Sequence, residues 1–128
     1  MQRILVIDDN QQVRATMLLT LQAKGFQVVA VDNGEAGIKT FDESKFDLAI
    51  VDIFMPGLDG TKVIQTLQQR APNLPIIAIS GVPLRVAGRG DIISVVPELS
   101  NVVSLQKPFR PADLFNAIQQ AMGAQSAA

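Results

Sequence analysis

A short, unbroken apolar run that ends in a carboxylate constrains the fold of this chain more than any other feature. Residues 48–51 read Leu-Ala-Ile-Val and are followed by Asp52. A run of this length without a polar residue is typical of a strand that is covered on both faces. Met-Pro-Gly at 55–57 and Asp-Gly at 59–60 then indicate a loop. Asp52 is therefore expected at the end of a buried strand, where open parallel sheets bind their ligands.

Four similar runs, separated by segments with helical spacing of apolar residues, predict the rest of the sheet. They lie at 4–7, 27–31, 76–79 and 102–105, and the polar start of the second one indicates an edge strand. Strands that alternate with helices favour an α/β fold, a doubly wound five-stranded parallel sheet with right-handed crossovers.

The chain is predicted to form one domain, residues 1–122, followed at 123–128 by a flexible C-terminal tail or a truncated linker. Helix boundaries are indicated by Gly25 after the first helical segment and by Pro111 at the start of the last one. Residues 82–101 mix Gly and Pro with apolar pairs, which predicts a long loop with a short or distorted helix. The fourth helix region is therefore expected to be atypical.

Composition excludes several classes of function. The 128 residues contain no Cys and no His, which rules out disulfides, Cys-bound zinc and a histidine base or ligand. A net charge of -1 gives no electrostatic reason to expect nucleic acid or an anionic membrane as a partner. The N-terminal segment resembles neither a signal peptide nor a membrane span, so a cytoplasmic protein is expected.

Polar residues follow four of the five predicted strands, and the carboxyl ends of parallel strands share one edge of a sheet. Asp8 and Asp9 follow the first strand, Asp52 the third, Ser80 the fourth and Lys107 the fifth. Each residue alone has an ordinary explanation, such as a helix cap, a turn or a solvated loop. Together, three carboxylates and one ammonium sum to a charge that a divalent cation would cancel. Mg²⁺ prefers such oxygen ligands and accepts a phosphoryl group beside them, with Asp52 as the nucleophile.

At this point the chain resembles the receiver domain of two-component response regulators, over residues 1–122. The resemblance implies a flavodoxin-like strand order of 2-1-3-4-5. It rests on Asp8-Asp9, on Val-Asp-Ile-Phe-Met-Pro-Gly at 51–57, on Asp-Gly at 59–60, on Ser80-Gly81 and on Lys107-Pro108-Phe109.

The resemblance implies the following site. Asp52 accepts a phosphoryl group from a histidine kinase, a histidine phosphotransfer protein or a small acyl phosphate. Asp9, Asp52 and the backbone carbonyl of Phe54 hold Mg²⁺, and Asp8 acts through a water. Ser80 and Lys107 bind the phosphoryl oxygens, and the Lys107–Pro108 peptide bond is cis. The chain is then a regulatory domain and not an enzyme with a separate substrate.

Departures from the family pattern lie on the face that normally signals. Ser104 occupies the position that usually carries an aromatic residue, so phosphorylation is expected to act through the surface formed by residues 82–105. The output is expected to be a downstream protein target or an effector domain that this chain lacks. Apolar residues at Phe54 and Val82, two residues beyond the acceptor and the hydroxyl, predict a long-lived phosphoryl group.

Two other interpretations remain open. A degenerate receiver would bind partners without phosphorylation, and the unusual Ser104 is compatible with this. An aspartyl-phosphate phosphatase of the haloacid dehalogenase type needs Asp-x-Asp after the first strand, but Asn10 stands where the second Asp is required. Phe54 and Phe109 are interpreted as packing residues, and Asp59 as part of an Asx turn.

Overall fold

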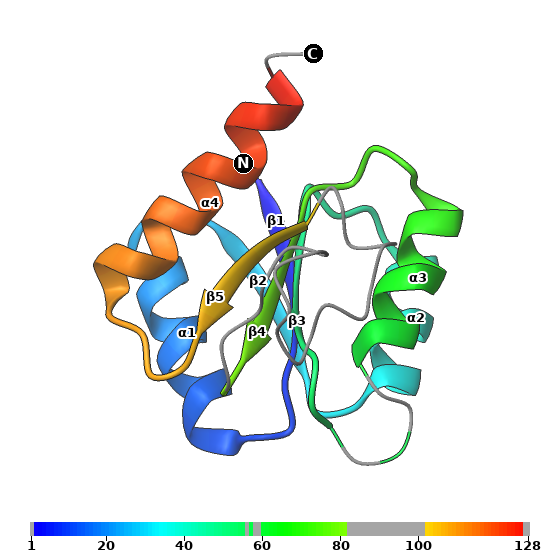
Figure 1. Ribbon diagram of the computed structural model, residues 1–128, viewed down its shortest axis with the longest axis horizontal. Coiled ribbons are helices and arrows are strands. Elements are labelled where there is room, and N and C mark those ends of the chain that lie inside the picture. Colours follow the sequence, from blue (N-terminus) through cyan, green and yellow to red (C-terminus); the bar gives the residue numbers. More distant parts are fainter. Residues whose placement is uncertain (1, 56, 58–59, 82–101, 127–128) are drawn as a thin grey trace, which may run out of the picture.

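The computed structural model describes residues 2–55, 57, 60–81 and 102–126 and shows a parallel sheet between two helical layers (Figure 1). The strand order β2-β1-β3-β4-β5 and the parallel pairing confirm the predicted flavodoxin-like α/β fold. The strands are β1 Arg3–Ile7, β2 Gln27–Val31, β3 Leu48–Asp52, β4 Ile76–Ser80 and β5 Val102–Gln106. The described helices are α1 Gln11–Ala23, α2 Gly34–Glu43, α3 Gly60–Arg70 and α4 Pro111–Ser126.

The two faces of the sheet are covered by different helices, α1 and α4 on one side and α2 and α3 on the other (Figure 1). Successive residues of a strand point to opposite faces. Ile4 and Val6 of β1 therefore pack with α1 and α4, whereas Leu5 and Ile7 pack with α3. This double coverage explains why β1, β3 and β4 read as unbroken apolar runs in the sequence. The more polar β2 is an edge strand, as predicted.

Helix boundaries follow the capping residues. Asn10 is the N-cap of α1, and its side-chain oxygen accepts a hydrogen bond from the backbone N–H of Val13 at 3.0 Å. Gly25 follows the C-cap with φ +93°, a conformation that favours glycine. Pro111 is the first residue of α4, as predicted. None of the described helices combines the length and apolar character that a membrane span requires.

The structure and the sequence prediction differ at the end of the chain. Helix α4 continues to Ser126, whereas the tail was expected to begin at residue 123. A single Gly123 disfavours a helix by only about 1 kcal/mol relative to alanine, which is too little to end it. The domain boundary after residue 122 stays a prediction. The loop and distorted helix expected at 82–101, and with them the atypical fourth helix region, lie outside the described residues, as does Asp59.

The register of the sheet brings the strand ends together. Ile7 of β1 is paired with Val51 of β3, so the next residues along these strands, Asp8 and Asp52, lie side by side. Asp52 is in turn paired with Ile79 of β4, directly before Ser80. Backbone pairing therefore places Asp8, Asp52 and Ser80 at the same edge of the sheet.

Replacing the N-cap of α1 tests how this helix is fixed beside the strand ends. Asn10→Ala should lower the free energy of unfolding by about 1 kcal/mol, because the N–H of Val13 loses its acceptor. Asn10→Ser should retain most of the stability, because a serine hydroxyl accepts the same bond. Urea denaturation followed by circular dichroism measures both, and an equal loss in the two variants would contradict the capping role.

Candidate functional site

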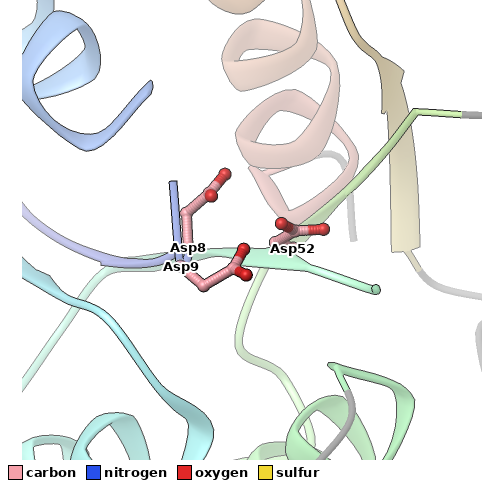
Figure 2. A group of neighbouring side chains, drawn as sticks. All are labelled: Asp8, Asp9 and Asp52. Carbon is pink, nitrogen blue, oxygen red and sulfur yellow. The ribbon is translucent and has the colours of Figure 1, made fainter. Parts of the chain in front are cut away.

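Three aspartates gather at the carboxyl ends of β1 and β3 (Figure 2). One oxygen from each of Asp8, Asp9 and Asp52 lies within 4.8 Å of the others. Asp8 is fully buried and Asp52 is 3% exposed, whereas Asp9 lies at the surface. The cluster is therefore a buried pair of carboxylates with a third one at its opening.

Lys107 supplies the positive charge of the site. Its Nζ lies 3.1 Å from Oδ2 of Asp8 and 3.2 Å from Oδ2 of Asp52. The backbone N–H of Lys107 donates to the carbonyl oxygen of Ser80 at 2.7 Å, which ties the residue to the end of β4. Burial acts to lower the pKa of Lys107, but the hydrogen bond and the charge of Asp8, followed by those of Asp52, raise the pKa overall. Lys107 therefore stays charged and links the two buried carboxylates.

The surroundings of Asp52 disfavour the negative charge of its carboxylate. Burial and the neighbouring charge of Asp8 raise its pKa to about 6, against 3.8 ordinarily. Lys107 and the backbone N–H of Phe54, which donates to Oδ1 of Asp52 at 3.0 Å, oppose this rise. Asp52 is thus mostly ionised at neutral pH, although burial and the charge of Asp8 disfavour its charged form.

The cluster fits a hard divalent cation. Oδ1 of Asp8 accepts the backbone N–H of Asn10 at 2.8 Å, but Oδ2 accepts no hydrogen bond from any described residue, although Lys107 lies close to it. This buried oxygen lacks a hydrogen-bond donor in the described chain and lies beside two further carboxylates, so it can coordinate a cation that prefers oxygen ligands. Mg²⁺ suits this donor set better than zinc, because the chain offers neither Cys nor His.

The remaining residues predicted for the site lie beside the cluster. Ser80 is fully buried at the end of β4, next to Lys107. The Lys107–Pro108 peptide bond is cis, and Phe109 packs against the layer of α1 and α4, both as expected. Phe54 is different, because its side chain is 54% exposed. The packing predicted for Phe54 was wrong, since the chain leaves the sheet after Asp52 and carries the ring out of the core. Its carbonyl as a metal ligand stays a prediction.

One contributor to the site was missed in the sequence. Nη1 of Arg14, on α1, donates a hydrogen bond to the backbone carbonyl of Asp8 at 2.8 Å. This bond fixes the turn that carries the two acids and brings a second positive charge near them. A basic residue one helical turn beyond the N-cap is the signal that could have indicated it, but many helices carry such a residue for solubility alone.

Comparison with known proteins identifies the family. The sequence model of the response regulator receiver domain matches residues 4–119. The chain is 33% identical over 120 residues to the response regulator receiver protein CpdR of Brucella abortus, covering 94% of this chain and 96% of CpdR. The chain therefore belongs to the response regulator receiver domain family, the regulatory signalling domains of two-component systems.

Relatives and solved structures agree with this assignment. The chain is 37% identical over 82 residues to the CAI-1 autoinducer sensor kinase/phosphatase CqsS of Vibrio cholerae, but it spans only 12% of that protein. Among solved structures, a CheY-like receiver domain protein of Methanospirillum hungatei has a TM-score of 0.86 at 22% identity, covering 99% of this chain and 98% of its own. The response regulator TrrA of Thermotoga maritima, solved in complex with Mg²⁺-BeF, has a TM-score of 0.77 at 28% identity and covers 94% of this chain and 99% of its own.

The raised pKa of Asp52 predicts a pH-dependent stability. The folded protein holds this proton up to about pH 6, the unfolded chain only to about 3.8, so protonation favours folding in acid and the benefit is lost as the pH rises through 6. In metal-free buffer, Asp52→Asn should therefore be more stable than wild type at neutral pH, by on the order of 2 kcal/mol. The difference should shrink below pH 6 and vanish near pH 4.

Urea denaturation at a series of pH values measures this difference. Glu43→Gln, the same carboxylate-to-amide change at an exposed residue at the end of α2, is the matched control. A stability difference for Asp52→Asn that stays constant across the pH range would contradict the electrostatic origin.

Proposed function

We propose that this receiver domain is a phosphorylation switch in which Asp52 is the acceptor. One observation carries the proposal: a nearly buried carboxylate at the end of the central strand lies between a second carboxylate and the ammonium of Lys107. Neither a helix cap nor a turn requires this arrangement, and it leaves Asp52 with more negative charge nearby than its surroundings compensate.

In the proposed reaction, an oxygen of the Asp52 carboxylate forms a bond to the phosphorus of the donor. With a phosphohistidine, the P–N bond breaks and its electron pair stays on the imidazole nitrogen. With an acyl phosphate, the P–O bond breaks and the acyl carboxylate leaves. Lys107 is placed to neutralise charge on the transferred group, and the hydroxyl of Ser80 to donate to one of its oxygens. Mg²⁺, held by Asp8, Asp9, Asp52 and the carbonyl of Phe54, would neutralise the remaining phosphoryl charge.

A surface beside the site supports a helical protein donor. A hollow of about 480 Å³ is lined by Gln12, Val13 and Thr16 of α1 and by Lys107, Pro108 and Phe109. Leu19, 69% exposed, follows Gln12 and Thr16 at helical spacing, so it extends the same face of α1. We assign this surface to a helix of a histidine kinase or histidine phosphotransfer protein, which would bring its phosphohistidine to Asp52.

The output of the switch is proposed to pass through residues 82–105 to a downstream protein or to an effector domain. Residues 82–101 lie outside the described part of the chain, so the proposal rests on β5. Ser104 of β5 is exposed, and this strand contains no aromatic residue. A cytoplasmic location, the absence of nucleic acid and membrane partners and the absence of a separate enzymatic activity stay predictions of the sequence.

Incubation with acetyl phosphate and Mg²⁺, followed by intact-mass measurement, tests the acceptor. Wild type should gain the mass of one phosphoryl group, and Asp52→Asn should gain none, because the amide nitrogen and oxygen are poor nucleophiles. Glu43→Gln, at an exposed residue at the end of α2, should behave as wild type. A wild-type protein that binds Mg²⁺ but never gains a phosphoryl group would instead support the phosphorylation-independent binding module.

The exposed ring of Phe54 predicts a slow loss of the phosphoryl group. An apolar side chain at the mouth of the site cannot orient a hydrolytic water by hydrogen bonding. Phe54→Asn should therefore speed hydrolysis several-fold, whereas Phe54→Leu, which stays apolar, should change it little. The decay of the phosphorylated mass after removal of the donor measures both rates, and equal rates in the two variants would contradict this role.

A further inference from the structure

Gly60, the first residue of α3, lies directly against the peptide bond that follows Asp52. A β-carbon placed on Gly60 would be 2.1 Å from the carbonyl oxygen of Asp52 and 2.5 Å from Cα of Ile53. Distances below 3.0 Å do not occur for real β-carbons unless a neighbouring atom moves. Gly60 is also not among the described glycines with a positive φ, so its backbone conformation would accept alanine and only the contact forbids it.

The same residue closes the loop that leaves the site. The backbone N–H of Gly60 donates to the carbonyl oxygen of Ile53 at 3.0 Å, and the N–H of Ile53 donates to the carbonyl oxygen of Ile79 at 2.9 Å. The N–H of Phe54, one residue further, donates to the carboxylate of Asp52 at 3.0 Å. The chain therefore leaves β3 at Ile53 and returns onto the same peptide bond at Gly60, and both ends of the loop are set by backbone atoms.

We propose that Gly60 is a positioning residue for the phosphorylation site. By allowing α3 to touch the backbone of Asp52, it fixes the direction of the acceptor carboxylate and of the Phe54 backbone. A side chain at position 60 has to displace the 52–53 peptide bond or lift α3 away from it. Either movement displaces the acceptor relative to Asp8 and Lys107, which are held by other elements. This inference rests on the proposed function for its consequence in catalysis, but its consequence for metal binding does not depend on phosphorylation.

Gly37 on α2 provides a matched control. A β-carbon on Gly37 would also be too close to its neighbour, but the neighbour is Cδ1 of Ile7 at 2.3 Å, the end of a core side chain. Alanine at either position should therefore destabilise the protein, whereas only alanine at position 60 should disturb the site. The obstructing atoms also differ in kind: Ile7→Val removes Cδ1, the nearest atom, and leaves Cγ1 at 2.8 Å, so it should recover part of the stability that Gly37→Ala loses. No side-chain truncation can relieve Gly60→Ala, so Ile53→Ala should not restore it.

The experiment compares Mg²⁺ affinity, phosphorylation by acetyl phosphate and urea stability in wild type, Gly60→Ala and Gly37→Ala. Calorimetric titration measures the affinity, because the chain has neither Trp nor Tyr as a fluorescent reporter. Gly60→Ala should lose Mg²⁺ affinity by about tenfold or more, a loss typical of disturbed support around a metal site, and its phosphorylation rate should fall with it. Gly37→Ala should keep the wild-type affinity whatever its loss of stability, and Asp9→Ala marks the loss expected when a carboxylate is removed.

Unaltered Mg²⁺ affinity in a folded Gly60→Ala protein would overturn the proposal and leave Gly60 as a packing residue. If this variant is partly unfolded, both glycine variants are compared in trimethylamine N-oxide, which favours compact states. Failure to fold even there would also overturn the proposal, because positioning predicts a displaced loop and not a lost core. If wild type is never phosphorylated, the proposed function fails, and the Mg²⁺ comparison still decides the role of Gly60.

Discussion

The candidate site depends on one electrostatic arrangement, two buried carboxylates that share the ammonium of Lys107. Asp8 and Asp52 lie beside each other because β1 and β3 are paired in register, and Lys107 contacts both from the end of β5. Like charges in a medium of low dielectric constant repel strongly, and the positive charges of Lys107 and Arg14 do not balance three carboxylates. The domain therefore maintains an excess of negative charge at one edge of its sheet. Burial and this excess together raise the pKa of Asp52.

The fold tolerates these buried charges because apolar side chains make up most of the rest of its described core. Apolar side chains cover both faces of the sheet, and the buried charged residues of the described chain, Asp8 and Asp52, lie at the strand ends. The elements around the cluster hold its backbone, not only its side chains. Arg14 bonds the carbonyl of Asp8, Asn10 caps the helix that follows, and Gly60 contacts the carbonyl of Asp52. Site geometry is thus transmitted through main-chain atoms, which can shift far less than long side chains.

Much of this could be predicted from the sequence, for a definite reason. Buried parallel strands need unbroken apolar runs, and their carboxyl ends meet, so Asp8, Asp52 and Lys107 could be placed together without coordinates. The strand order follows from the resemblance to receiver domains and not from the pattern of the runs. The contacts of Arg14 and Gly60 could not be predicted, because they depend on how closely α1 and α3 approach the strand ends. The exposure of Phe54 depends on the direction in which the chain leaves β3. The extension of α4 to Ser126 depends on how little a single glycine destabilises a helix. Neither quantity leaves a periodic pattern in the sequence.

The ion pair between Lys107 and Asp8 joins residues that are 99 positions apart. The two acids lie at the ends of β1 and β3, and their cation follows β5, so β1, β3 and β4 all precede it along the chain. The acid pair therefore meets its ammonium only through the pairing of β5 with β4. The charge balance of the site is therefore a tertiary property, because it exists only when β1, β3 and β5 are assembled in one sheet.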